Sequence, residues 1–501
     1  MHNNEMKVGA FLSYIKMVIA FLASMLLTPI MLRMLGKSEY GLYMLIGALV
    51  GYISIFDFGL HNTIYRFISK YQAEKKEKEQ ENFIAVCLLI YVVISLIVIF
   101  VGFFIVSKVD LIFSQSLTEV EIDKAKIMSL ILVLNLSFSL PMRSFEFIIR
   151  GYGKFIIVNS ISIARIIIRT VTVAFFLLIG FKSIALVVID SIINIIILFY
   201  FMFYALSKLK VKIKLHYINK QILEKIFSYS VYVFILAIVN QLFWKIGQGV
   251  LGIFNSTHDV AIFSLGITLV MYFQQLSLGV SSVFMPRISK MIYDGADGNQ
   301  LTNLMIKIGR IQMFALALIV VVFWTNGKDF ICLWAGEEYI NSYWIAAIVI
   351  TALLVPLSQT IAGVILQAKN LISFKAIAYS IMAIANLILS IIVSKNFGAI
   401  GLSLVTFVLL IIFQVIVINI YYKRRLDINV MRFAKKTICQ LKFPIIITLV
   451  IGSLMSDIGD VSWAMFLIKC SILCLVYFSV LWIKSLNESE KKMLKKIVGK
   501  Y

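Results

Sequence analysis

Charged residues are scarce in this chain of 501 residues: Asp, Glu, Lys and Arg make up 14% of it, whereas hydrophobic residues make up 61%. Soluble globular domains are about 25% charged and about 45–50% apolar, so the composition excludes a soluble enzyme and a disordered chain. Cysteine is also scarce, and its five residues show no spacing typical of a metal site or a disulfide framework. No P-loop or catalytic dyad is recognisable, and we expect neither a cofactor nor enzymatic activity.

Long apolar runs dominate the sequence instead. Runs of about 20 residues recur from end to end, and each is long enough to cross a bilayer as a helix. The sequence therefore predicts an all-α polytopic membrane protein with about fourteen transmembrane helices. The predicted spans are 9–32, 40–63, 83–107, 127–149, 155–179, 183–206, 228–254, 260–283, 311–333, 342–366, 376–394, 400–422, 443–457 and 462–483.

The net charge is +22, from 47 Lys and Arg against 25 Asp and Glu. In a soluble chain this excess would indicate a nucleic-acid partner, but cytoplasmic loops of membrane proteins collect Lys and Arg. With the N-terminus inside, the inside loops hold 33 basic residues and the outside loops hold 8. We therefore predict that both termini are cytoplasmic, and we expect no nucleic-acid partner.

An internal repeat with an offset of 220 residues pairs residues 39–71 with residues 259–291. Both copies contain a glycine nine residues before an Ile-Ser-Lys sequence, which ends at Lys70 and Lys290. Both run from outside to inside, so we predict two similar lobes, a common transporter architecture with substrate at the lobe interface. A repeat retained only for packing is the alternative. The predicted parts are a six-helix lobe at 1–206, a cytoplasmic linker at 207–227, a second six-helix lobe at 228–422, a basic cytoplasmic loop at 423–442, two extra helices at 443–483 and a cytoplasmic tail at 484–501.

Charged side chains inside the predicted spans carry the functional hypothesis, because each costs about 2.5–3.5 kcal/mol at the bilayer centre. Arg143, Arg165 and Arg169 lie on polar stripes of the fourth and fifth spans. They outnumber the nearby acids Glu146 and Asp190, and the planar fork of arginine suits phosphate. We predict a cationic cavity for an anionic substrate with a phosphate or pyrophosphate group. Its candidate residues are Lys16, Arg143, Arg165, Arg169, Gln241, Lys245, Gln274 and Gln275.

The acids in these spans leave two interpretations open. Glu146 could form a structural ion pair with Arg143 or Arg150, and Asp190 could neutralise another arginine. Alternatively, a carboxylate at membrane depth can couple transport to a proton or sodium gradient. The candidates for ion coupling are Asp190, which we prefer, Glu146 and Asp57.

Several sequence motifs resemble those of a known family. Leu35-Gly-Lys-Ser-Glu-Tyr-Gly-Leu-Tyr resembles the opening signature of Wzx-type polysaccharide flippases, as does Asp57-Phe-Gly-Leu. Ile365-Leu-Gln-Ala-Lys-Asn, Asn386 and Phe397-Gly-Ala-Ile-Gly-Leu-Ser continue the likeness. These flippases are members of the multidrug/oligosaccharidyl-lipid/polysaccharide exporter superfamily.

This resemblance implies the two-lobed fold of multidrug and toxic-compound extrusion (MATE) transporters. It also implies export of undecaprenyl-pyrophosphate-linked oligosaccharide repeat units across a bacterial inner membrane, by alternating access. The product would be O-antigen of lipopolysaccharide, or capsule. Membrane lipids, a polysaccharide polymerase and a chain-length regulator are the candidate partners that the resemblance implies.

Other functions remain as alternatives. A MATE-like drug or cation antiporter would have a cavity rich in carboxylates and aromatic rings, which the arginine excess disfavours. A peptidoglycan-precursor flippase would share the fold and the anionic substrate. A polysaccharide polymerase or ligase would need a large extracytoplasmic loop, and the longest predicted outside loop is only residues 108–126. A scaffold for glycan assembly would not need arginines inside the membrane.

Overall fold

The computed structural model describes residues 2–53, 60–217, 238–369, 371, 373–456, 458–488 and 490–492. Within these ranges every regular element is a helix, and no strand is present. The predicted all-α fold class is therefore confirmed.

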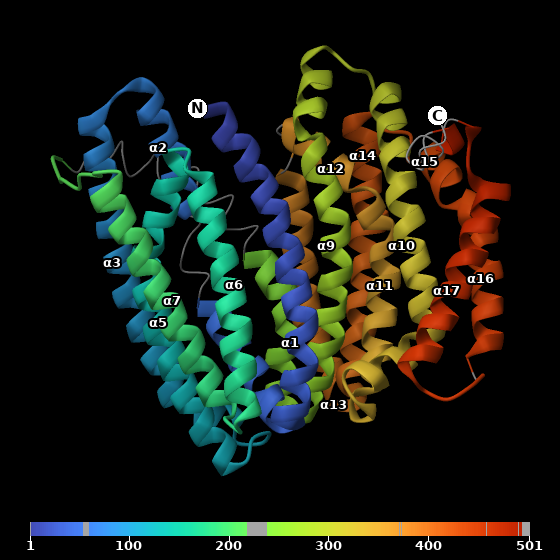
Figure 1. Cartoon of the computed structure of the whole chain (residues 1–501), viewed down its shortest axis with the longest axis horizontal. Helices are drawn as coiled ribbons and strands as arrows, with labels where there is room; N and C mark the ends of the chain where they lie inside the picture. The colour runs from blue at the N-terminus through green and yellow to red at the C-terminus, as the bar shows by residue number, and fades with distance from the viewer. Residues whose placement is uncertain are drawn as a thin grey trace. The chain divides into compact units, whose positions relative to one another are not determined.

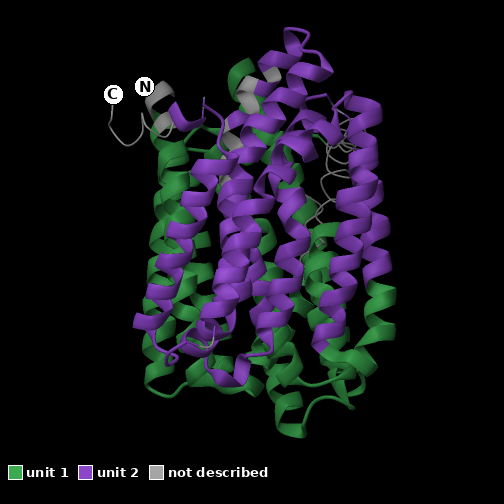
Figure 2. Cartoon of the chain, turned by 90° about the vertical axis from the view of Figure 1, so that its right-hand side faces the viewer, with its two compact units in different colours: residues 1–264, 387–398 green, residues 265–386, 399–501 purple. Residues whose placement is uncertain are grey.

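Two compact units make up the chain (Figure 2). Unit 1 comprises Met1–Ser264 and Leu387–Gly398, and unit 2 comprises Leu265–Asn386 and Ala399–Tyr501. The helix over residues 238–254 thus groups with unit 1. The lobe boundaries proposed from the sequence remain a prediction.

Unit 1 is built on long helices that pack side by side. Helix α1 lies along α6, and α5 contacts both α3 and α7 (Figure 1). The elements of this unit are α1 (His2–Ile53), α2 (Leu60–Glu74), α3 (Glu77–Ser107), α4 (Val109–Phe113), α5 (Glu119–Gly151), α6 (Phe155–Leu178), α7 (Ser183–Phe203), η2 (Tyr204–Lys208) and the helix over residues 238–254.

Helix α3 shows how the helices of this unit divide their surfaces. Tyr91 and Val98 are fully buried in the core of unit 1. Leu96, Phe100 and Phe104, at a spacing of four residues, are each more than 60% exposed. Water would disfavour such an apolar stripe, whereas the acyl chains of a bilayer accept it.

Ten helices of the described chain are long and apolar enough to cross a membrane, or eleven if the bent pair α11–α12 forms one span. The protein is therefore a multi-pass membrane protein, but the predicted count of fourteen is not confirmed. Two of the ten helices each join two predicted spans. They break at Gly36 (φ 75°) and at Gly398 (φ 51°), where the left-handed backbone favours glycine. The predicted span 228–254 begins outside the described residues.

Pro141, which lies inside α5, has a specific partner for the backbone group that it releases. A proline lacks the N–H that would bond the carbonyl four residues earlier, here that of Ser137. The hydroxyl of Ser95 on α3 donates to this carbonyl at 2.7 Å, in a buried position. The freed group is thus satisfied inside the protein, as the bilayer interior requires.

Unit 2 contains most of α9 and all later elements outside Leu387–Gly398. Helix α10 contacts α11, α15, α16 and α17 and forms the centre of this unit (Figure 1). The elements are α9 (Thr257–Tyr293), α10 (Gly298–Trp334), η3 (Glu337–Tyr339), α11 (Ser342–Ser358), α12 (Thr360–Ala368), α13 (Ser373–Leu409), η4 (Leu410–Val417), α14 (Ile418–Leu426), α15 (Val430–Thr437), η5 (Cys439–Leu441), α16 (Lys442–Met455), α17 (Trp463–Val480) and η6 (Leu481–Ser485).

Two ion pairs fasten the last helices to α10. The Lys469 ammonium on α17 bonds Asp329 at 3.1 Å and the Ser456 carbonyl at 2.9 Å. The guanidinium of Arg310, whose side chain is 3% exposed, donates to both carboxylate oxygens of Glu490, at 2.6 and 2.8 Å. These pairs account for two cations that lie on apolar helices.

Replacing Lys469 by methionine should destabilise unit 2, because Asp329 would lose its ionic partner. Removing one member of a buried ion pair typically costs about 3–5 kcal/mol, whereas replacing both members by apolar residues is often neutral. Thermal unfolding in detergent should show a lowered midpoint for Lys469→Met and recovery in Lys469→Met/Asp329→Leu. An unchanged midpoint in the single variant would contradict this role of the pair.

Candidate functional site

The polar residues predicted from the sequence gather in unit 1, where α1 and α6 are in close contact. Gly9 allows this approach, because a Cβ atom there would lie 2.5 Å from Cβ of Phe155. The buried amide of Asn159 on α6 donates to the Gly9 carbonyl and to the Ser13 hydroxyl, each at 2.9 Å. Its carbonyl oxygen lies 3.5 Å from Nζ of Lys16. This local packing positions Lys16 beside α6.

The acid of α5 is shared unequally between two arginines. Arg150 donates two hydrogen bonds to Oε1 of Glu146, at 2.7 and 3.2 Å. Nε of Arg143 lies 4.0 Å from Oε2 of the same carboxylate, and the Arg143 side chain is 57% exposed. The predicted ion pair of Glu146 is thus formed mainly with Arg150, and the Arg143 side chain stays more than half exposed.

Asp190 on α7 forms the ion pair that was one of its two predicted roles. Arg169 donates to both carboxylate oxygens, at 2.6 and 2.9 Å. The Tyr43 hydroxyl donates to the same carboxylate at 3.1 Å and lies 3.3 Å from the Arg169 guanidinium. Arg169 and Asp190 therefore neutralise each other and tie α6 and α7 to α1.

Arg165 differs from its neighbours because no carboxylate bonds it within the described part of the chain. Its side chain is exposed and lies one helical turn before Arg169 on the same face of α6, whereas Arg169 is paired with Asp190. It lies within electrostatic range of Arg143, Glu146, Arg169 and Asp190, and Lys16 lies within range of Arg150 and Glu146. Five cations thus accompany two carboxylates, which leaves an excess of three positive charges. We call Lys16, Arg143 and Arg165 the cationic cluster.

Uncharged polar groups join α5 and α7 within the same unit. The amide of Asn194 donates to the amide oxygen of Asn135 at 2.9 Å and to the Ser139 hydroxyl at 2.7 Å. All three side chains are half-buried. Such groups can exchange hydrogen bonds with the hydroxyls of a polar substrate.

The remaining predicted residues lie apart from this set or outside the described chain. Gln241 and Lys245 are half-buried on the helix over residues 238–254, and the Gln241 amide packs against Gly51. Gln274 and Gln275 are half-buried on the part of α9 that lies in unit 2. Asp57 lies outside the described residues.

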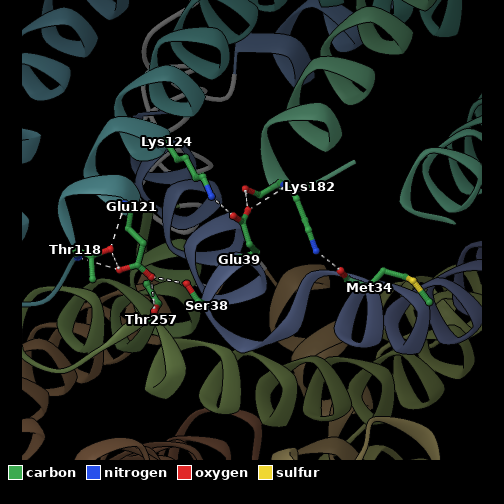
Figure 3. Close-up of polar contacts among 9 residues, drawn as sticks. Met34, Ser38, Glu39, Thr118, Glu121, Lys124, Lys182 and Thr257 are labelled. Carbon is green, nitrogen blue, oxygen red and sulfur yellow. Dashed lines mark hydrogen bonds and ion pairs between the residues drawn. The ribbon is translucent and has the colours of Figure 1, made fainter. Parts of the chain in front are cut away.

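A second polar cluster, which sequence reasoning did not find, joins the start of α5 to α1 and α9 (Figure 3). Oε1 of Glu121 accepts hydrogen bonds from Ser38 at 2.6 Å and from Thr257 at 2.9 Å. The backbones of α1 and α9 meet here, since a Cβ on Gly41 would lie 1.9 Å from the Thr257 carbonyl oxygen. We call Ser38, Glu121 and Thr257 the hairpin latch.

A neighbouring carboxylate extends these contacts to α7. Glu39 pairs with Lys124 of α5 and accepts a hydrogen bond from the Ser183 hydroxyl at the start of α7 (Figure 3). One signal for the latch was present in the sequence, because Thr118-x-x-Glu121 is a capping box that begins α5. The contacts of Glu121 with Ser38 and Thr257 could not be predicted from a local pattern, because these residues lie 83 and 136 positions away in the sequence.

Comparisons with known proteins agree with this architecture. The family model described as "Polysaccharide biosynthesis protein" matches residues 7–292. The chain belongs to this family. The matched residues include the cationic cluster, the hairpin latch, Lys245 and the glutamines of α9.

Solved structures of transporters share the fold. Lipid II flippase MurJ in an inward closed conformation has a TM-score of 0.74 at 17% identity, over 95% of this chain and 98% of that chain. An inward-facing MATE multidrug transporter has a TM-score of 0.55 at 13% identity, over 82% of this chain and 96% of that chain. A transporter from Pyrococcus furiosus has a TM-score of 0.53 at 13% identity, over 84% and 94%. No curated protein matches the chain by sequence.

These structural matches show that the chain has a MATE-like membrane fold, as the sequence predicted. The solved structures that share this fold are those of a lipid II flippase and of multidrug transporters. At sequence identities this low, the structural likeness establishes the fold alone, so the substrate must be argued from the residues of this chain.

Proposed function

We propose that this protein is a flippase for undecaprenyl-pyrophosphate-linked oligosaccharide repeat units, which it carries across the bacterial inner membrane for O-antigen or capsule synthesis. The observation that carries the proposal is the excess of positive charge around Arg143 and Arg165, inside helices of a polysaccharide-biosynthesis family member. Unpaired guanidiniums in a membrane span are costly, and a pyrophosphate would supply the missing acceptors.

In this proposal each part of unit 1 has a role in binding. Arg143 and Arg165 bind the pyrophosphate through paired N–H donors, and Lys16 adds a point charge. The amides and hydroxyl of Asn135, Ser139 and Asn194 face the sugar hydroxyls, while the polyprenyl chain stays in the bilayer. In the same proposal Gln241 and Lys245 add donors on the helix over residues 238–254 of unit 1, and Gln274 and Gln275 remain candidate residues on the part of α9 that lies in unit 2.

The hairpin latch closes the outer side of the transporter in this proposal. The positive-inside rule places the hairpin at Gly36 and the start of α5 outside, with both termini in the cytoplasm. Alternating access requires the contacts of Thr257 with Glu121 to break when the outer side opens. The same proposal includes the two six-helix lobes and the cytoplasmic linker and tail. It also includes a polymerase and a chain-length regulator as partners.

Asp190 is the proposed site of coupling to a proton or sodium gradient, ahead of Glu146 and Asp57. Binding of a proton or a sodium ion to the Asp190 carboxylate would release Arg169, because the bound ion and the guanidinium compete for the same oxygens. In proteoliposomes, an imposed gradient should stimulate flipping by the unaltered protein and by Glu146→Gln, but not by Asp190→Asn. Equal stimulation of Asp190→Asn would remove Asp190 from this role.

A peptidoglycan-precursor flippase is the second candidate, favoured by the likeness to a lipid II flippase over almost the whole chain. Deletion of the gene in its host separates the two. Loss of surface polysaccharide, with repeat units trapped on the cytoplasmic leaflet, supports the proposal. Lysis with lipid II accumulating inside supports the second candidate. Repeat units that reach the outer leaflet unpolymerised would overturn the proposal in favour of a polymerase, and an unchanged glycan would favour a MATE-like antiporter.

A further inference from the structure

A hollow at one end of unit 2, far along the chain from the cationic cluster, combines groups of opposite charge. It has a volume of about 570 Å³ and lies where α14 ends and α15 begins. Lys423, Asp427 and Asn419 line it together with apolar side chains. The Lys423 and Asp427 side chains are both exposed, and no ion pair joins them in the described structure.

Asn419 carries a buried, unsatisfied acceptor in the wall of this hollow. Its side chain is 9% exposed, and its Oδ1 atom has no hydrogen-bond partner. The orientation of the amide is fixed, because its Nδ2 donates to the Val415 carbonyl at 2.7 Å and a flipped amide would place two acceptors together. Because this oxygen is itself buried, the charged groups of the hollow that an occupant can reach are those of Lys423 and Asp427.

An apolar stripe leads from the bilayer into the hollow. Ile412, Ile416 and Ile420, at a spacing of four residues, are 41–51% exposed and end one turn before Lys423. An exposed stripe of this kind on a membrane helix faces acyl chains. Lipid chains along the stripe therefore bring a lipid headgroup to Lys423, Asp427 and Asn419.

The walls of the hollow are held in place by α10. The Asn429 backbone N–H donates to the Thr302 hydroxyl at 3.0 Å, and the Asn429 side chain caps α15. Asp427 has a left-handed backbone (φ 52°), and its carbonyl packs against Gly298. Ile428 and Phe433 on either side are fully buried. Lys423 and Asp427 thus project from a well-packed junction between α14 and α15.

We propose that this hollow is a binding site for a phospholipid whose headgroup combines a phosphate with a primary ammonium, as in phosphatidylethanolamine. Lys423 binds the phosphate, while the exposed carboxylate of Asp427 accepts hydrogen bonds from the ammonium. The carboxylate of Asp427 disfavours an anionic headgroup, although Lys and Arg are abundant between residues 423 and 442. The site is independent of the proposed flippase activity.

The test measures lipid binding to the purified full-length protein in detergent by native mass spectrometry. The probes are phosphatidylethanolamine, phosphatidylcholine and phosphatidylglycerol with identical acyl chains. Phosphatidylethanolamine should bind about tenfold more tightly than phosphatidylcholine, because the quaternary ammonium of the latter cannot donate hydrogen bonds. Equal binding of these two lipids, or tighter binding of phosphatidylglycerol, would overturn the proposal.

Two variants locate the preference in the hollow. Asp427→Asn keeps a side chain that tolerates the left-handed backbone and should reduce the preference to about twofold. Arg425→Gln, which changes an exposed basic residue that does not line the hollow, should leave the preference unchanged. A full preference in Asp427→Asn would also overturn the proposal. If a variant fails to fold, the comparison of the three lipids on the unaltered chain still decides.

Discussion

Replacing Arg165 by alanine should abolish surface polysaccharide export while the protein still inserts into the membrane. Arg165 has no carboxylate partner within the described chain, so its loss leaves no buried acid uncompensated and should not destabilise unit 1. A hydrogen bond to a charged group contributes roughly 1.5–3 kcal/mol, so a lost bidentate contact should lower the rate at least about a hundredfold. Surface polysaccharide in a host that lacks the native gene is the measurement.

Matched variants separate binding from folding. Arg165→Lys keeps the charge but not the planar fork, and it should retain only part of the activity. Arg143→Ala should resemble Arg165→Ala, whereas Lys214→Ala, at an exposed position outside the cationic cluster, should be inert. Normal polysaccharide in both arginine-to-alanine variants, at normal protein levels, would refute the proposed pyrophosphate site.

A disulfide between cysteines at positions 38 and 257 should stop transport completely. Ser38 and Thr257 bond the same oxygen of Glu121, so Ser38→Cys and Thr257→Cys bring two thiols close together. In the alternating-access proposal this contact must open once in each cycle, and a covalent bond would hold it closed. Oxidation should remove flipping in proteoliposomes, and reduction should restore it.

Single-cysteine variants control for the substitutions themselves. In a background in which the five native cysteines are replaced by serine, each should keep most of its activity under oxidising conditions, because one thiol cannot form the intramolecular bond. Full activity of the double variant, with the disulfide shown to have formed, would mean that the hairpin latch is not a gate.

The sequence predicted helices well where apolar runs have sharp polar ends. The predicted span 155–179 corresponds to α6 (Phe155–Leu178), because Lys154 and Gly180 bound it. The span 127–149 is shorter than α5 (Glu119–Gly151), since the helix begins in polar sequence at the capping box of Thr118. The length of an apolar run reflects the thickness of the bilayer, whereas capping residues and hydrogen bonds determine where a helix begins and ends.

The pairing of charges could not be predicted in the same way. The excess of arginines over acids was visible in the sequence. No local sequence pattern indicated that Asp190 pairs with Arg169 and leaves Arg165 without a carboxylate partner. Lys469 had no interpretation from sequence, because its partner Asp329 lies 140 residues earlier. Pairings of this kind arise from helix packing, which brings together residues that share no sequence pattern.

The buried pair of Arg310 and Glu490 has a consequence for the biogenesis of the protein. The two residues are 180 positions apart, so Arg310 is synthesised long before its partner exists. At about 5–20 residues per second, synthesis of the intervening chain takes roughly 10–40 s. Until Glu490 is synthesised, the Arg310 guanidinium on α10 lacks its carboxylate partner. This contact therefore forms only in chains that extend to Glu490.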